Sequence, residues 1–263
     1  MIPPTPSDQL EGREQAILFA PFGVGKTTMA MTISAQCPAH VTATIAAPPP
    51  TAPVATIDDI AWLAVDRNAL AGFKALKVRV PLLYDLSAVP PTRIVEEVLE
   101  ILAECRKTGV QHVVVDTLTA FDTVLQARHR AKAATNKMAY YDSILADHMR
   151  VWDALRQTDA TVQLLAHVKP AFDADDAAKL KRQTLEIADF AAQITGQAGT
   201  RYKADCDFIF FLQRKTAMLN GKKQTRVVVR TQPQGGTECK VRGGVGVPEE
   251  LDADWRVIRA ALA

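Results

Sequence analysis

The sequence contains few cysteines, and none of them forms a pair of the kind that binds zinc. Cys37, Cys105, Cys206 and Cys239 are widely spaced, with no C-x2-C motif among them. Cys37 and His40 form one C-x2-H pair, but no second pair completes a set of four zinc ligands. The spacing therefore argues against a zinc ribbon and against a disulfide framework, and it favours reduced thiols.

Long apolar runs and an excess of charge of one sign are also missing. No apolar run approaches the roughly 20 residues that cross a bilayer, and residues 1–12 lack the basic-then-apolar pattern of a signal peptide. We therefore expect a cytoplasmic protein with no membrane partner. The formal net charge is only +2, from 31 basic and 29 acidic residues, so any surface for a polyanion must be local.

The length and composition predict one main domain with small additions. A chain of 263 residues with 48% apolar content can bury one sizeable core. We expect an N-terminal extension over residues 1–14, a core over residues 15–247 and a C-terminal helix over residues 248–263. Within the core, the proline cluster at 48–58 predicts a surface loop, because proline fits neither a helix interior nor a central strand.

Apolar runs alternate with helical patterns along the core. Strands are expected over residues 15–20, 60–65, 110–116 and 161–167, and helices over residues 27–35, 92–107 and 138–157. This alternation predicts a doubly wound α/β fold with a mostly parallel sheet. Two further strands flank Asn220-Gly221, a strong hairpin signal, so the C-terminal strands should be antiparallel.

The run from Ala20 to Thr27 fits the spacing of a phosphate-binding P-loop, although alanine stands where the first glycine is usual. The glycines let successive backbone N–H groups face the phosphates of ATP, and the helix that follows adds its dipole. Lys26 should reach the β and γ phosphates, and Thr27 should ligate Mg²⁺; the alternative is a glycine-rich turn. The nucleotide-binding residues we expect are Phe22, Gly23, Val24, Gly25, Lys26, Thr27 and Thr28.

Acidic residues follow two of the expected strands. Asp116 ends the run His112–Asp116, where a carboxylate can hold Mg²⁺ together with Thr27, although it could simply cap the next turn. The next residue is Thr117 and not glutamate, so the catalytic base must come from elsewhere. Asp66 is our candidate for orienting the attacking water, because adjacent strand ends converge on one crevice. An ordinary surface turn is the alternative for Asp66.

This order of parts resembles the RecA-type recombinase core, and especially the small phage-encoded RecA-like ATPases linked to single-strand annealing and recombination. The resemblance covers residues 15–233 and rests on the segments 23–27, 64–70, 113–117 and 164–167. It implies a RecA-like P-loop NTPase core with an AAA-type ATPase domain that hydrolyses ATP with Mg²⁺ and binds single-stranded DNA. It also implies a homo-oligomeric ring or filament in a bacterial host cell, with a single-strand-binding or replication protein as a further partner.

The resemblance also suggests roles for residues beyond the P-loop. His167 matches the polar residue that senses the γ-phosphate in the family, where glutamine is more usual; a histidine satisfied within the sheet is the alternative. Residues 169–204 match the second DNA-binding loop in position and glycine content. The DNA contacts we expect there are Lys169, Lys179, Lys181, Arg182, Arg201, Tyr202 and Lys203, with Tyr202 stacking on an unpaired base.

A local basic cluster follows this region. Residues 201–230 contain eight basic side chains against two acids, which suits DNA, although hairpin lysines can also be simply solvated. Arg230, at the end of its strand, could act as an arginine finger on a neighbouring subunit. Two other functions stay open: a small-molecule P-loop kinase with a lid over residues 171–199, and an ATP-dependent switch or loader that recruits a replication partner.

Overall fold

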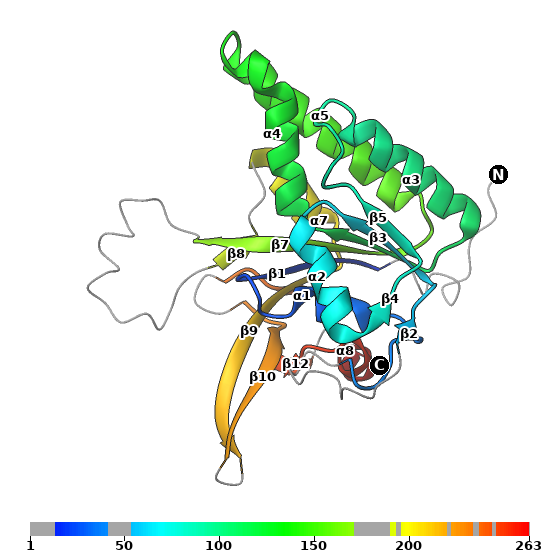
Figure 1. Cartoon of the computed structure of the whole chain (residues 1–263). Coiled ribbons are helices and arrows are strands. Elements are labelled where there is room, and N and C mark those ends of the chain that lie inside the picture. The colour runs from blue at the N-terminus through cyan, green and yellow to red at the C-terminus, as the bar shows by residue number, and fades with distance from the viewer. Residues whose placement is uncertain are drawn as a thin grey trace, which may run out of the picture.

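The computed structural model describes residues 14–41, 54–170, 190–192, 196–219, 222–233, 237–243 and 246–262. Several predictions lie outside these residues: the extension up to residue 13, the prolines at 48–53, the basic residues Lys179, Lys181 and Arg182, and the turn Asn220-Gly221. Figure 1 shows a sheet with helices against both of its faces, which is the doubly wound arrangement that the sequence predicts.

The main sheet is parallel at its centre and antiparallel at its C-terminal edge. Strand order is β12-β10-β9-β1-β7-β6-β3-β5, with β11 paired to β9 and β8 to β7. The parallel strands are β1 (Gln15–Ala20), β3 (Ile60–Ala64), β5 (Leu82–Asp85), β6 (His112–Asp116), β7 (Thr161–Pro170) and β9 (Phe208–Leu219). The strands that pair antiparallel to them or to each other are β8 (Phe190–Ala192), β10 (Lys222–Arg230), β11 (Lys240–Val241) and β12 (Glu250–Asp252).

Two apolar cores lie on opposite faces of this sheet because its central strands bury apolar side chains on both faces. Side chains of β3 and β6 are buried along their whole length, as expected for parallel strands covered on both sides. One core packs against α3 (Ile94–Thr108), α4 (Leu118–Ala133), α5 (Lys137–Arg156) and α7 (Gly196–Asp205). The other packs against α1 (Lys26–Met31), α2 (Arg67–Leu76) and α8 (Trp255–Leu262).

Helix α3 ends where the sequence predicts. Gly109 adopts a left-handed conformation with φ 66°, and its N–H donates to the carbonyl of Cys105. A residue with a Cβ is disfavoured in that conformation, so glycine stops the helix there. Helix α4 was not anticipated from the sequence. It exposes most of its length and buries only a few residues near its start, which leaves a weak apolar pattern.

Four features differ from the sequence prediction. Helix α1 ends at Met31, well before residue 35, and β7 continues to Pro170 because its end pairs with β8. Part of the expected proline-rich loop is ordered, since β2 (Ala55–Thr56) pairs with β4 (Val78–Arg79). The C-terminal segment starts with a strand rather than a helix, and β12 extends the main sheet beside β10. Among the described helices, none is long and apolar enough to cross a membrane.

Candidate nucleotide-binding site

The predicted site residues come together at the carboxyl edge of the parallel strands. The register places Ala20 beside His167 and Ala64 beside Asp116, so the segments that follow β1, β3, β6 and β7 meet at one edge. A cavity of about 210 Å³ opens there. It is lined by Phe22, Gly23, Gly25, Lys26, Thr27, Thr28, Asp66, Asp116, Thr117 and His167. Of the nucleotide-binding residues we expected, Val24 alone is absent from this lining, because its side chain is buried in the core beneath the loop.

The backbone of the P-loop explains which glycines the motif needs. Gly23 and Gly25 have φ values of 74° and 112°, in the left-handed region that favours glycine. Ala20, at the first motif position, instead belongs to strand β1 and pairs with His167. A strand residue has no need of glycine, so alanine at this position leaves the geometry of the loop intact.

Lys26 is buried in the loop with its ammonium group turned into the site. Its Nζ donates to the carbonyl of Ala20 at 3.0 Å and to that of Pro21 at 3.4 Å, and lies 3.5 Å from Nδ1 of His167. Burial lowers the pKa of Lys26 to about 8, an effect that Asp116 and Asp66 oppose. The cation is therefore held by neutral carbonyl oxygens, which a phosphate group would outcompete as a partner.

Thr27 and Asp116 provide the oxygen atoms that suit Mg²⁺. The Thr27 hydroxyl donates to Oδ2 of Asp116 at 3.2 Å. Burial raises the pKa of Asp116 to about 6, against the opposing effects of that hydrogen bond and of Lys26. Magnesium in nucleotide sites takes one or two protein oxygens and completes its shell with phosphates and water, so this pair fits it. When bound, the ion would neutralise charge on the β and γ phosphates.

Asp66 and His167 flank the same cavity. Asp66 follows β3 and its N–H donates to the carbonyl of Asp116 at 3.2 Å, so it lies inside the site and not on a remote surface turn. His167 is half-buried, and its pKa is lowered, first by burial and then by the charge of Lys26. A neutral imidazole can still donate a hydrogen bond to a phosphate oxygen. The ring of the exposed Phe22 lies 6.2 Å from that of His167, stacked at 30°.

Two residues near the site escaped the sequence analysis as site residues. Thr119, in the first turn of α4, accepts a hydrogen bond from the backbone N–H of His167 at 2.9 Å. Arg214, on β9, donates from Nη2 to the carbonyl of Gly23 in the P-loop. No local sequence pattern marks either residue, because both contacts depend on strands and helices that are far apart along the chain.

The expected role of Tyr202 in stacking on a base is wrong for this structure. Residues 196–204 of the segment expected as a glycine-containing loop belong to helix α7, and Tyr202 lies on the inner face of this helix with no exposed surface. Its hydroxyl lies 3.1 Å from Nδ1 of His148, and its ring packs 4.9 Å from that of Trp152. Lys203 forms an ion pair with Glu238 at 2.6 Å, whereas Arg201 is exposed. Lys169 belongs to strand β7.

The basic cluster on the hairpin is partly paired with acids outside the window in which it was counted. Lys215 pairs with Glu250 at 2.5 Å, and Arg226 pairs with Asp252 at 3.4 Å. Arg230 lies 3.9 Å from Glu250 and is absent from the lining of its own chain's nucleotide cavity. These acids come from β12, so the pairing of β10 with β12 explains the loss of local positive charge.

A different basic surface lies at the turn between α4 and α5. We call it the basic tip and define it as Arg130, Lys132, Lys137, Met138 and Tyr141. All five residues are exposed, and the sequence contains no acid between Asp122 and Asp142. Figure 1 shows α4 and α5 extending together away from the sheet, with this turn at their far end. The tip therefore combines positive charge with an exposed aromatic ring.

The chain was compared with protein families, with curated sequences and with solved structures. A family model described as an AAA domain matches residues 13–242. No curated protein sequence matches the chain. A RadB recombinase structure is similar, with 17% identity, a TM-score of 0.38 and 84% of each chain covered. A KaiC-like protein from Pyrococcus horikoshii OT3 is similar at 12% identity and a TM-score of 0.41, over 82% of this chain and 78% of that one. The chain belongs to the AAA domain family, and its α/β fold has a main sheet that is parallel at its centre and antiparallel at its C-terminal edge.

Proposed function

We propose that this protein hydrolyses ATP and that the nucleotide controls its grip on single-stranded DNA during recombination or strand annealing. The observation that carries the proposal is helix α4, which begins at the nucleotide site and ends at the basic tip. Its N-cap, Thr117, directly follows Asp116, and its last turn contains Arg130 and Lys132. A helix of this length spans about 24 Å, so one rigid element joins the two surfaces.

Each residue of the site has a defined task in this proposal. The P-loop N–H groups and Lys26 hold the phosphates, while Thr27 and Asp116 hold Mg²⁺. Asp66 orients the attacking water, and the neutral His167 donates a hydrogen bond to the γ-phosphate. Because His167 also donates its backbone N–H to Thr119, a shift of His167 on hydrolysis would move the first turn of α4.

The basic tip supplies the chemistry that single strands require. Cations neutralise backbone phosphates, and an exposed tyrosine offers a face on which unpaired bases stack without sequence preference. Assembly into a homo-oligomeric ring or filament would line up the tips of successive subunits along one strand. In that assembly Arg230 would reach the nucleotide of the neighbouring subunit, and a single-strand-binding or replication protein would deliver the DNA.

Steady-state ATP hydrolysis with and without single-stranded DNA tests the proposal, with Lys26→Ala as the blank. We expect turnover that rises with DNA and disappears in the variant. Turnover that ignores DNA would count against the coupling. Phosphorylation of an added nucleoside or nucleotide would instead identify a kinase, and tight ATP binding without phosphate release would identify a switch or loader.

The double variant Arg130→Ala with Lys137→Ala tests the location of the DNA surface. Each phosphate contact on a single strand contributes about 0.7 to the slope of log affinity against log salt. We therefore expect the slope to fall by about 1.4 in fluorescence anisotropy titrations of labelled single-stranded DNA. The matched control is Arg106→Ala with Lys107→Ala, which removes two exposed charges from the end of α3. An equal fall in this slope for both double variants would rule out a specific role for the basic tip.

A further inference from the structure

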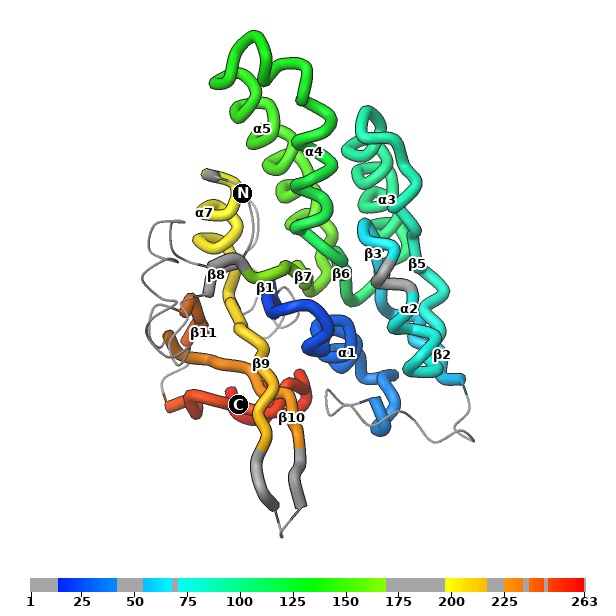
Figure 2. Tube along the Cα trace, turned by 60° about the vertical axis from the view of Figure 1, so that its left-hand side comes forward, coloured from blue at the N-terminus to red at the C-terminus, as the bar shows by residue number. Residues whose placement is uncertain are grey.

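The base of the β9–β10 hairpin lies beside the P-loop. Strand β9 pairs with β1 up to the level of Phe211 and Phe19, and then continues past the end of β1. Arg214 is three residues further along, which brings it level with the loop that follows β1. Figure 2 shows β9 and β10 running on together beyond the neighbouring strands, with β1 and α1 beside their base. Arg214 pairs across the hairpin with Val227.

Three consecutive residues of the loop contact this hairpin. Arg214 donates from its guanidinium to the carbonyl of Gly23. Val24 is buried in the same apolar cluster as Leu212 and Val227. A Cβ at Gly25 would lie 3.8 Å from Cγ2 of Val227, so this side chain of the hairpin lies next to the loop at that residue. The loop therefore rests on β9 and β10 along one side, while no described residue of the hairpin lines the nucleotide cavity on its other side.

The contact at Gly23 sets the direction of the next amide. In a trans peptide the carbonyl of one residue and the N–H of the following residue point in opposite directions. A guanidinium that holds the Gly23 carbonyl toward the hairpin thus turns the N–H of Val24 away from the hairpin. The glycine at position 23 has a wide choice of backbone angles, so an outside contact is needed to select one orientation.

We propose that Arg214 is a positioning residue for nucleotide binding: it fixes the Gly23–Val24 peptide so that the Val24 N–H faces the phosphates. This inference rests on the proposed function, because it names a residue that prepares the same site for ATP. Arginine suits the task because its guanidinium stays charged at every physiological pH and keeps a fixed planar geometry. The phosphates contacted by the loop are present in both ATP and ADP, so both nucleotides depend on Arg214.

Binding of fluorescent ATP and ADP analogues to the full chain, together with steady-state hydrolysis, tests this inference. Arg214→Ala should raise Kd for both nucleotides by the same factor, about five- to tenfold, as expected for one hydrogen bond at an exposed position. KM should rise in parallel, while kcat at saturating ATP stays within about twofold. Arg214→Lys should recover at least half of the lost binding free energy, because an ammonium group can also donate to the carbonyl.

The matched control is Arg226→Ala, which removes a positive charge from the same hairpin at an exposed position paired with Asp252. It should leave Kd unchanged. Unchanged Kd in Arg214→Ala would overturn the inference, as would a fall in kcat or an effect on ATP alone, since either would mean direct action on the γ-phosphate. A lower melting temperature without nucleotide, combined with unaltered Kd, would reduce Arg214 to a structural role. If the wild-type chain binds neither nucleotide, the proposed function itself fails.

Discussion

Asp66 and Asp116 follow neighbouring strands and face one cavity, but their surroundings suit different tasks. Asp116 is almost completely buried and accepts a hydrogen bond from Thr27, which fixes the carboxylate for a metal ion. Asp66 is only partly buried, so water can reach it. A carboxylate beside both the phosphate loop and solvent is placed to orient a water molecule.

Asp66→Asn should therefore slow ATP hydrolysis while leaving ATP binding nearly unchanged. We expect kcat for ATP hydrolysis to fall by about 100-fold or more, as for loss of a general base, while Kd for ATP stays within about threefold. Steady-state hydrolysis and equilibrium nucleotide binding on the same preparation measure the two quantities. Asp116→Asn serves as the comparison, because it should also weaken the response to Mg²⁺. Wild-type kcat in Asp66→Asn would remove Asp66 from the reaction.

His112 lies at the start of β6, at the other end of the strand from the site, and it makes the stability of the fold depend on pH. It is buried, with Nε2 3.8 Å from Oδ2 of Asp59, and burial lowers its pKa to about 4. Between about pH 6.5 and pH 4 the unfolded chain binds a proton at this residue that the folded chain excludes. The stability associated with His112 is therefore present above the unfolded pKa and is lost as the pH falls through this window.

We expect the melting temperature to drop more steeply from pH 7 to pH 5 in the wild type than in His112→Gln, whose amide does not titrate. Differential scanning fluorimetry at the two pH values measures both slopes. Other groups contribute equally to both proteins, so the difference reports on His112. Parallel slopes would show that His112 is not responsible.

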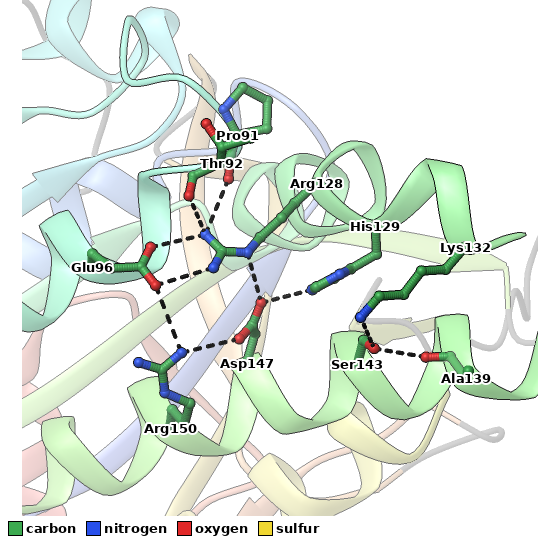
Figure 3. Close-up of polar contacts among 10 residues, drawn as sticks. All are labelled: Pro91, Thr92, Glu96, Arg128, His129, Lys132, Ala139, Ser143, Asp147 and Arg150. Carbon is green, nitrogen blue, oxygen red and sulfur yellow. Dashed lines mark hydrogen bonds and ion pairs between the residues drawn. The ribbon is translucent and has the colours of Figure 1, made fainter.

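At the scale of elements, one polar cluster holds α3, α4 and α5 together and so supports the basic tip. Arg128 binds Glu96 through two hydrogen bonds of 2.9 and 3.1 Å and lies 3.1 Å from Asp147 (Figure 3). Asp147 also pairs with His129 at 2.8 Å and with Arg150 at 3.4 Å. Asp147 is buried and carries the charge on which three basic side chains converge.

Asp147→Ala should lower the free energy of unfolding by about 3 kcal/mol, because it leaves partly buried cations without their counter-charge. Urea denaturation measures the change. Glu104→Ala is the matched control: it breaks the exposed Glu104–Lys107 pair at 3.5 Å and should cost less than about 1 kcal/mol. Similar losses in both variants would mean that the cluster adds little beyond a surface ion pair.

Some elements could be predicted from local sequence and others could not. The buried strands, the stop at Gly109 and the hairpin of β9 and β10 follow from apolar runs and turn residues, which act over a few positions. Helix α7 was missed because its glycines resemble a loop and its burial depends on α5. The acids that neutralise the hairpin were missed because β12 joins β10 from a distant part of the chain.

For the whole molecule, Trp255 connects the C-terminal helix to the core on the P-loop side of the sheet. It is 1% exposed, its backbone N–H donates to Oγ1 of Thr32 at 2.9 Å, and its Nε1 donates to Oε1 of Gln163 at 2.7 Å. Gln163 in turn donates to the carbonyl of Ala30 at the end of α1. The C-terminal residues thus close the core of this chain.

Trp255→Ala should cost about 3 to 5 kcal/mol in the free energy of unfolding, since it opens a large cavity and removes the donor to Oε1 of Gln163. Chemical denaturation followed by far-ultraviolet circular dichroism measures it. Val257→Ala, on the exposed side of the same helix, should change stability by less than about 1 kcal/mol. A small effect of Trp255→Ala would mean that α8 is dispensable for the fold.

The nucleotide site was predicted from the sequence more completely than any other part of the molecule. The reason is that the P-loop motif is defined by the spacing of residues within eight positions. Lys26, Thr27, Asp66, Asp116 and His167 all lie where strand ends were expected to meet. Thr119 and Arg214 reach the site through tertiary contacts alone, so no local pattern could reveal them. The charge pattern of the surface depends on which side chains pair after folding, and only the packed structure decides that.

The position of β1 between β9 and β7 affects how the chain folds while it is being synthesised. Its partners are β7 and β9, which begin at Thr161 and Phe208, so the first of the described strands pairs with strands that are synthesised much later. At a synthesis rate of roughly 5–20 residues per second, about 10 to 40 s pass between the synthesis of β1 and that of β9. Until β7 and then β9 are synthesised, this largely apolar strand has open edges, which makes the nascent chain a natural client for a chaperone.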